Sequence, residues 1–127
     1  MSVTINNVTP GKCGAVVFAV GSVDSTGKAA LTHVCDGTSV KGSNRSPYPH
    51  PYRNYEHLDF PGCGVTKGGY EYPIFPNKQF TSGAQPGVNR IVVGEVDKTQ
   101  RTGKVCGLMR HAKGNSFILC NYGANVA

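Results

Sequence analysis

The stretch "NRIVVGEVDKTQRTGKVCGLMRHAKGNSFILCNY", residues 89–122, decides the fold. It contains three runs rich in β-branched and apolar residues, at 89–96, 104–112 and 116–122, separated by the short polar turns "DKTQRTG" and "AKGN". Runs of this kind between turn residues indicate strands, and such short turns favour antiparallel neighbours. A further run, "GYEYPIF" at 69–75, adds another strand to the predicted sheet.

The segment before this sheet changes its period. In "SVDSTGKAALTHVCDG", residues 22–37, apolar and small residues recur at helical spacing, Ser22 can cap the start and Gly37 can end the helix. "GAVVFAV", residues 14–20, reads as an N-terminal strand. The sequence therefore predicts an α+β fold, with one N-terminal α-helix packed on a twisted antiparallel β-sheet of four to five strands and preceded by a short N-terminal strand or hairpin.

Length and charge narrow the class of protein. The chain has 127 residues, which suits one domain, and its 17 Gly and 8 Pro imply many turns. A net charge of +6 favours a polyanionic partner such as nucleic acid. No apolar run is long enough to span a membrane, so we expect no membrane partner, and we expect the protein to act as a monomer.

The chain has five cysteines, which is many for its length. Cys13 and Cys120 lie near opposite ends, as a disulfide that closes a small secreted fold would require. We therefore expect a secreted, extracellular protein whose signal peptide has been removed. Because five is odd, one thiol is left over, and the sequence by itself permits several pairings, or reduced buried cysteines.

Four residues fall on one face of the predicted sheet. Side chains alternate across a strand, so Glu71 faces away from Tyr70 and Tyr72, and Arg90 faces away from Ile91. His111 is opposite in parity to Cys106 and Leu108, and Phe117 is opposite to Ile118 and Cys120. We therefore expect Glu71, Arg90, His111 and Phe117 to share one solvent-facing surface.

That set supplies a base, an acid and an anion clamp, which suits attack on a phosphate or acyl centre. The alternative is a solvated Glu–Arg pair across two strands with a surface histidine beside it. The histidines and cysteines show neither CxxC nor HxxxH spacing, and there is no acidic cluster. We therefore expect no metal site and no cofactor.

The segment "SPYPHPYRNYEHLDF", residues 46–60, gathers three tyrosines. Tyr52 and Tyr55 offer flat faces on which an unpaired base can stack. Glu56 accepts hydrogen bonds only, and guanine presents adjacent N–H donors on its Watson–Crick edge. The segment therefore predicts a guanine site, and the alternative is a tyrosine-rich loop packed over a small core.

Four blocks of the sequence together resemble a known family. They are "YPHPYRNYEHLDF", "YEYPI", "GVNRIVV" and "GLMRHAKGNSFILC", which span roughly residues 43–120. In this order they resemble the base-recognition segment, the catalytic-glutamate strand, the arginine strand and the catalytic-histidine strand of the small fungal guanyl-specific ribonucleases, which are related to the ribotoxins. The resemblance implies one microbial ribonuclease domain over residues 1–127.

The resemblance also implies catalytic roles. Glu71 would take the proton from the ribose 2′-OH, and His111 would protonate the departing 5′-oxygen, leaving a 2′,3′-cyclic phosphate. His50 would assist Glu71 or replace it. Three further residues would complete the site: Arg90 and Tyr48 at the phosphoryl oxygens, and Phe117 on the leaving-group side. The substrate would be single-stranded RNA, because DNA lacks the 2′-OH.

In the base site that the resemblance implies, guanine lies between Tyr52 and Tyr55, and Glu56 binds its N1 and N2 hydrogens. Arg53 belongs to the same segment, and backbone groups near Asn54 and Asn115 complete the site. The implied disulfides join Cys13 to Cys120 and Cys63 to Cys106, so that Cys35 is the odd thiol, and the Tyr48–Pro49 bond would be cis.

Two alternatives to an enzyme that cleaves after guanosine stay open at this point. One is a ribotoxin-like protein that acts on ribosomal RNA or on host ribosomes. The other is a secreted ribonuclease-like effector that binds RNA without cutting it.

Overall fold

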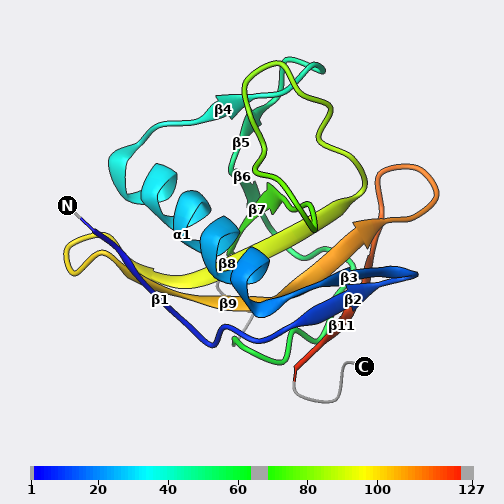
Figure 1. The fold of residues 1–127 in the computed structure, drawn as a ribbon, viewed down its shortest axis with the longest axis horizontal. Helices are drawn as coiled ribbons and strands as arrows, with labels where there is room; N and C mark the ends of the chain where they lie inside the picture. Colours follow the sequence, from blue (N-terminus) through cyan, green and yellow to red (C-terminus); the bar gives the residue numbers. More distant parts are fainter. Residues whose placement is uncertain (1, 64–68, 124–127) are drawn as a thin grey trace.

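The computed structural model describes residues 2–63 and 69–123. One helix and a series of mostly short strands make up the fold (Figure 1). In chain order the elements are β1 (Thr4–Asn6), β2 (Gly11–Cys13), β3 (Val16–Phe18), α1 (Val20–Asp36), β4 (Val40–Lys41), β5 (Pro47–Tyr48), β6 (His50–Tyr52), β7 (Gly69–Pro73), β8 (Asn89–Asp97), β9 (Thr102–His111), β10 (Phe117–Leu119) and β11 (Asn121–Tyr122).

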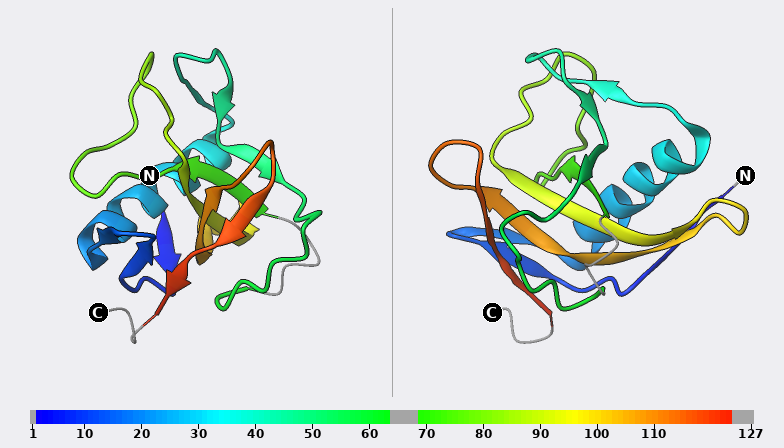
Figure 2. Two further views of the ribbon diagram at one scale, coloured as in Figure 1. Left: turned by 90° about the vertical axis from the view of Figure 1, so that its right-hand side faces the viewer. Right: turned by 180° about the vertical axis from the view of Figure 1, so that it is seen from behind.

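The main sheet has six strands in the order β1-β9-β8-β7-β6, and β10 also pairs with β9. The pairs β6–β7, β7–β8, β8–β9 and β9–β10 are antiparallel, as the short turns predict. β1 pairs with β9 in parallel, so the sheet is mixed and one strand larger than expected. The views in Figure 2 show α1 on one side of this sheet. The predicted α+β fold is therefore confirmed.

The helix begins earlier than the sequence predicts. Its N-cap is Ala19, with no side-chain cap, while Ser22 lies inside the first turn and donates a hydrogen bond to the carbonyl of Pro76. The predicted strand at 14–20 is accordingly shortened to β3, which pairs with β2 in a hairpin. Gly37 ends the helix at a φ of 69°, as predicted. Within 2–63 and 69–123, no helix is long and apolar enough to cross a membrane.

A bulge in β9 changes the predicted alternation. Val92 pairs with Gly107 but Val93 pairs with Val105, which leaves Cys106 as an extra residue. Val105 and Leu108 consequently both pack in the hydrophobic cluster beneath the helix, whereas Cys106 packs with Val92 in a second cluster. The predicted opposite parity of Cys106 and His111 is therefore wrong, because the bulge shifts the alternation by one residue.

The last predicted strand, at 116–122, is two strands. β10 continues the main sheet, while β11 leaves it at Cys120 and pairs with β2 in a three-stranded sheet. Ile118 is 41% exposed, so it does not belong to the core as its apolar character predicts, because β10 lies at the edge of the sheet.

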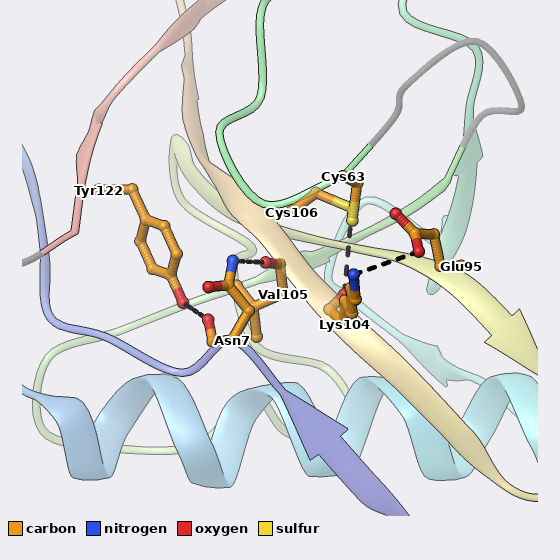
Figure 3. Close-up of a disulfide and its surroundings, with 7 residues drawn as sticks. All are labelled: Asn7, Cys63, Glu95, Lys104, Val105, Cys106 and Tyr122. Atoms are coloured by element: carbon orange, nitrogen blue, oxygen red, sulfur yellow. Dashed lines mark hydrogen bonds and ion pairs between the residues drawn. A yellow bond between two sulfur atoms is a disulfide. The ribbon is translucent and has the colours of Figure 1, made fainter.

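Two disulfides join distant parts of the chain. They join Cys13 to Cys120 and Cys63 to Cys106, and Cys35 is free, which is the pattern that the resemblance implies. Around the second disulfide, Asn7 Nδ2 donates to the carbonyl of Val105 at 2.9 Å (Figure 3). Tyr122 donates its hydroxyl hydrogen to the carbonyl of Asn7. The N-terminal and C-terminal segments are therefore both fixed against the sheet.

Two segments project together beyond the same end of the sheet (Figure 1). One is the β4–β5 hairpin and the other is the chain between β7 and β8. Backbone hydrogen bonds from Ser43 N to Ala84 O and from Gly83 N to Lys41 O join them. The second segment runs directly into β8, and it therefore brings backbone carbonyls to the residues at the start of that strand.

Candidate active site

An ion pair lies at the centre of the sheet face that is turned away from the helix. Arg90 Nε donates to Glu71 Oε1 at 3.1 Å, across the β7–β8 pair. Glu71 is 6% exposed and Arg90 is 2% exposed. The prediction of a solvent-facing surface is therefore wrong for these two residues and for Phe117, which is 8% exposed.

These residues are buried because other side chains pack over this face of the sheet, which the strand pattern does not reveal. Tyr52, the last residue of β6, and Phe60, from the segment after β6, pack on this face of the sheet with Val92, Met109 and Phe117. They form a second hydrophobic cluster, so both faces of the sheet are buried. The polar residues on this face are consequently held in a partly dry environment.

Arg90 is fixed by more than Glu71. Its Nη1 lies 2.7 Å from the carbonyl oxygen of Gly87 and 3.1 Å from that of Asn89, and its Nη2 lies 3.4 Å from the hydroxyl of Tyr48. A guanidinium has five N–H donors, and most of them are used here within the protein. Arg90 therefore acts on its surroundings mainly through its charge and its fixed position.

His50 lies beside Glu71. The two residues are cross-strand partners in the β6–β7 pair, and the His50 ring stacks on Tyr48 with 4.1 Å between ring centroids. The Tyr48–Pro49 bond that precedes His50 is cis, as the resemblance implies. Tyr48, His50, Glu71 and Arg90 thus form one contiguous group.

His111 and Phe117 form the other side of the site. They are cross-strand partners in the β9–β10 pair, and their ring centroids are 4.1 Å apart. His111 is half-buried, so its imidazole remains accessible. The structure therefore brings five of the six residues for which the resemblance implies a catalytic role together on one face of the main sheet. Tyr48, on β5 outside this sheet, joins them through His50 and Arg90.

Burial and charge shift the pKa values of three of these groups. Burial raises the pKa of Glu71, although the charge and the hydrogen bond of Arg90 oppose this. Burial, and then the charge of Arg90, lower the pKa of His50 and that of His111. Glu56 opposes the shift at His111. The pKa values of Glu71 and His111 therefore lie closer together than those of the free side chains, as suits a base and an acid that work together.

A pocket of about 550 Å³ adjoins these residues. It is lined by residues 51–56 together with Asn115 and Phe117, which includes every residue of the predicted base site. Tyr55 is 80% exposed at its rim, while Tyr52 is 7% exposed and packs edge-to-face on Phe60 and Phe117. Tyr55 is therefore the open aromatic face, and Tyr52 belongs to the wall of the pocket.

Glu56 is held in place inside this pocket. Its Oε1 accepts a hydrogen bond from the hydroxyl of Tyr52 at 2.8 Å, and its Oε2 accepts one from the backbone N–H of Phe117 at 2.7 Å. Burial opposes ionisation, but these bonds outweigh it and hold the pKa of Glu56 below its usual range. Glu56 is therefore an ionised acceptor with a fixed direction.

The side chain of Asn54 has a structural role that the sequence does not reveal. Its Oδ1 accepts from Leu58 N–H at 2.8 Å, and its Nδ2 donates to the carbonyl of Leu58 at 2.9 Å. Asn54 itself has a φ of 53°, a left-handed conformation that Asn tolerates better than most residues. These bonds close residues 54–58 into a compact loop. In the sequence, the only indication of this role is that an Asn stands within a polar segment.

Among residues 2–63 and 69–123, no three His, Cys, Asp or Glu side chains gather closely enough to hold a metal ion. The chemistry that the site offers is that of its own side chains: one carboxylate, two imidazoles and a guanidinium, next to a pocket with an anionic acceptor.

Comparison with known proteins agrees with this geometry. A family model described as ribonuclease matches residues 7–121. The chain is 33% identical to guanyl-specific ribonuclease Th1 of Trichoderma harzianum, over 85% of this chain and 93% of that protein. It is 34% identical to guanyl-specific ribonuclease Ap1 of Aspergillus pallidus, over 85% and 94% of the two chains. It is also 34% identical to guanyl-specific ribonuclease T1 of Aspergillus oryzae, over 85% and 75%. The chain therefore belongs to this ribonuclease family.

Proposed function

We propose that the protein is a secreted endoribonuclease that cleaves single-stranded RNA on the 3′ side of guanosine and leaves a 2′,3′-cyclic phosphate. One observation carries the proposal: Phe117 lines the pocket that contains Glu56, and its ring also lies against the ring of His111. A base bound in the pocket would thus place its own 3′-phosphate near His111, Glu71 and Arg90. The names of the relatives support guanine as that base.

In the first step, Glu71 acts as general base on the ribose 2′-OH. Its carboxylate is buried against Arg90, and its raised pKa makes it a better proton acceptor than a solvated glutamate. The 2′-oxygen attacks phosphorus, and the charge of Arg90 stabilises the phosphoryl oxygens. His50, the cross-strand neighbour of Glu71, assists it or takes its place. Tyr48 holds Arg90 and completes this side.

The leaving 5′-oxygen receives its proton from His111. Phe117 packs on the imidazole and shapes the leaving-group side. The bond from phosphorus to the 2′-oxygen forms as the bond to the 5′-oxygen breaks, and the products are a cyclic phosphate and a free 5′-OH. The substrate supplies its own nucleophile, so no metal-bound water is required for this step.

Base recognition rests on Glu56. An ionised carboxylate has about four lone-pair sites, of which Tyr52 and Phe117 use two, one on each oxygen. The others remain for the N1 and N2 hydrogens of guanine. Tyr55 provides the open stacking face, and backbone groups of Asn54 and Asn115 bind the remaining base edge. Arg53 also lines this pocket, and its charge attracts the RNA backbone.

Two features support secretion and a single catalytic unit. The disulfides Cys13–Cys120 and Cys63–Cys106 suit an oxidising compartment. The family match extends over residues 7–121, so we propose one ribonuclease domain for the whole chain.

The pH dependence of kcat/KM tests the roles of Glu71 and His111. The rate should rise as Glu71 ionises and fall as His111 loses its proton. Because the pKa of Glu71 is raised and that of His111 is lowered, the rising and falling limbs of the pH profile lie close together. We expect a narrow bell with its maximum in the mildly acidic range, measured on a guanosine-containing dinucleotide from about pH 3 to about pH 9. A rate independent of pH would rule out this acid and base pair.

A further inference from the structure

We propose that Glu56 has a second role besides receiving the base: it positions the His111 imidazole and favours its protonated form, acting through the backbone N–H of Phe117 and through its own charge. This inference rests on the proposed function, in which His111 is the general acid. It makes Glu56 a positioning residue for the reaction as well as a contact for the substrate.

The geometry forms a continuous connection of three contacts. Glu56 Oε2 accepts from Phe117 N–H at 2.7 Å, which fixes the first residue of β10. Phe117 is the cross-strand partner of His111, and its ring lies 4.1 Å from the imidazole, centroid to centroid. The hydrogen bond has an ionised acceptor, and such bonds are about twice as strong as neutral ones. A change at Glu56 therefore reaches His111 through one peptide group and one ring.

Besides the pairing of β10 with β9 and the packing of the Phe117 ring, this end of β10 is fixed by few contacts. β10 is only three residues long and lies at the edge of the sheet, and the turn that precedes it, residues 112–116, is exposed. One backbone bond, from Ala112 N to Ser116 O, closes that turn. The bond from Phe117 to Glu56 crosses 61 residues of sequence to the loop of the base pocket. It therefore ties the position of Phe117, and with it the stack on His111, to the base site.

The charges around His111 favour the same conclusion. Burial, and then the charge of Arg90 on β8, disfavour the imidazolium, and the charge of Glu56 opposes both effects. Loss of the Glu56 charge would therefore remove a contribution that favours the protonated imidazole. Other charged groups of the neighbouring elements are engaged elsewhere or exposed. Glu71 on β7 pairs with Arg90, and His50 on β6 stacks on Tyr48. Arg110 on β9 lies close to Gly14, and Lys113 is in the exposed turn.

The test uses three variants and two readouts on the ligand-free protein. Glu56→Gln keeps an acceptor but removes the charge, and Glu56→Ala removes both. Asp59→Asn removes an exposed carboxylate from the same segment and serves as the matched control. The pKa of His111 is followed by NMR titration, its signal assigned with His111→Gln, and the amide proton shift of Phe117 reports its hydrogen bond.

We expect the pKa of His111 to fall in both Glu56 variants and to stay near the wild-type value in Asp59→Asn. The amide signal of Phe117 should move upfield most strongly in Glu56→Ala. With a saturating guanosine dinucleotide, kcat should fall about 10-fold or more, in addition to a rise in KM, because part of the contribution of the general acid is lost.

An unchanged pKa of His111 in Glu56→Gln, or a rise in KM with kcat unchanged, would overturn the inference. The NMR readouts need no substrate. Failure of the wild-type protein to cut RNA would therefore count against the proposed function alone, and can be told apart from failure of this coupling.

Discussion

Replacement of His111 by glutamine is expected to lower kcat by about 10²-fold to 10⁴-fold, the usual contribution of a positioned general acid. The ring of His111 lies against that of Phe117, which lines the base pocket, and no second imidazole within residues 2–63 and 69–123 has a ring contact with Phe117. Loss of Glu71 should have a smaller effect, because His50 lies next to it and can replace it. The measurement is single-turnover cleavage of a guanosine dinucleotide at saturating enzyme concentration.

The matched control for this variant is His33→Gln. His33 lies on α1, on the other side of the sheet, where its Nδ1 is 2.7 Å from Thr38 Oγ1. Its substitution removes an imidazole without touching the site, so kcat should stay within about twofold of the wild-type value. Equal losses in the two variants would mean that the effect at His111 is a general loss of folded protein, and an undiminished kcat in His111→Gln would remove His111 from the mechanism.

The second large effect concerns stability. Replacement of both Cys13 and Cys120 by alanine should lower the free energy of unfolding by about 5 kcal/mol, because this disulfide closes a loop with a sequence separation of 107 residues. The same double replacement of Cys63 and Cys106, with a separation of 43 residues, should cost about 4 kcal/mol. Alanine suits the positions because Cys13, Cys106 and Cys120 are all buried.

Urea unfolding, followed by the far-UV circular dichroism of the helix and sheet, measures both differences by linear extrapolation. The wild-type protein under oxidising conditions is the reference. A loss below about 1 kcal/mol for the Cys13 and Cys120 pair would contradict a stabilisation that acts through the unfolded chain. A clearly larger loss for the shorter loop would do the same.

The general architecture was predictable because it depends on local pattern. The β-branched run at 89–96 and the run at 104–112 became the two long central strands β8 and β9, and the turn between them enforced their antiparallel pairing. The helix could be read from its spacing and from Gly37 at its end. The start of the helix could not be predicted in the same way. The helix begins at Val20 without a side-chain cap, and nothing in the sequence marks that start.

What the sequence did not reveal depends on contacts between distant segments. Parity correctly placed Glu71, Arg90 and Phe117 on one face, but predicted that they meet solvent. The cover comes from Tyr52 and Phe60, which belong to a different part of the chain. The bulge at Cys106 likewise depends on the register between β8 and β9, which one strand alone does not determine.

The base pocket shows the same division. Most of its residues were predictable because they are nearly contiguous, from Tyr52 to Glu56. Asn115 and Phe117, which also line it, come from a distant part of the chain. The hydrogen bond from Phe117 N–H to Glu56 could not be predicted, because every residue except proline has a backbone donor and the sequence does not mark which one is used. That bond nevertheless connects the proposed recognition site with the proposed catalytic site.

The most direct measurement is digestion of one end-labelled single-stranded RNA that contains all four bases, with EDTA present and with Glu71→Gln in parallel. The account predicts cuts after guanosine only, with 2′,3′-cyclic phosphate ends, and slower cleavage by the variant. The absence of cleavage by the wild-type protein, or cuts after every base alike, would contradict it.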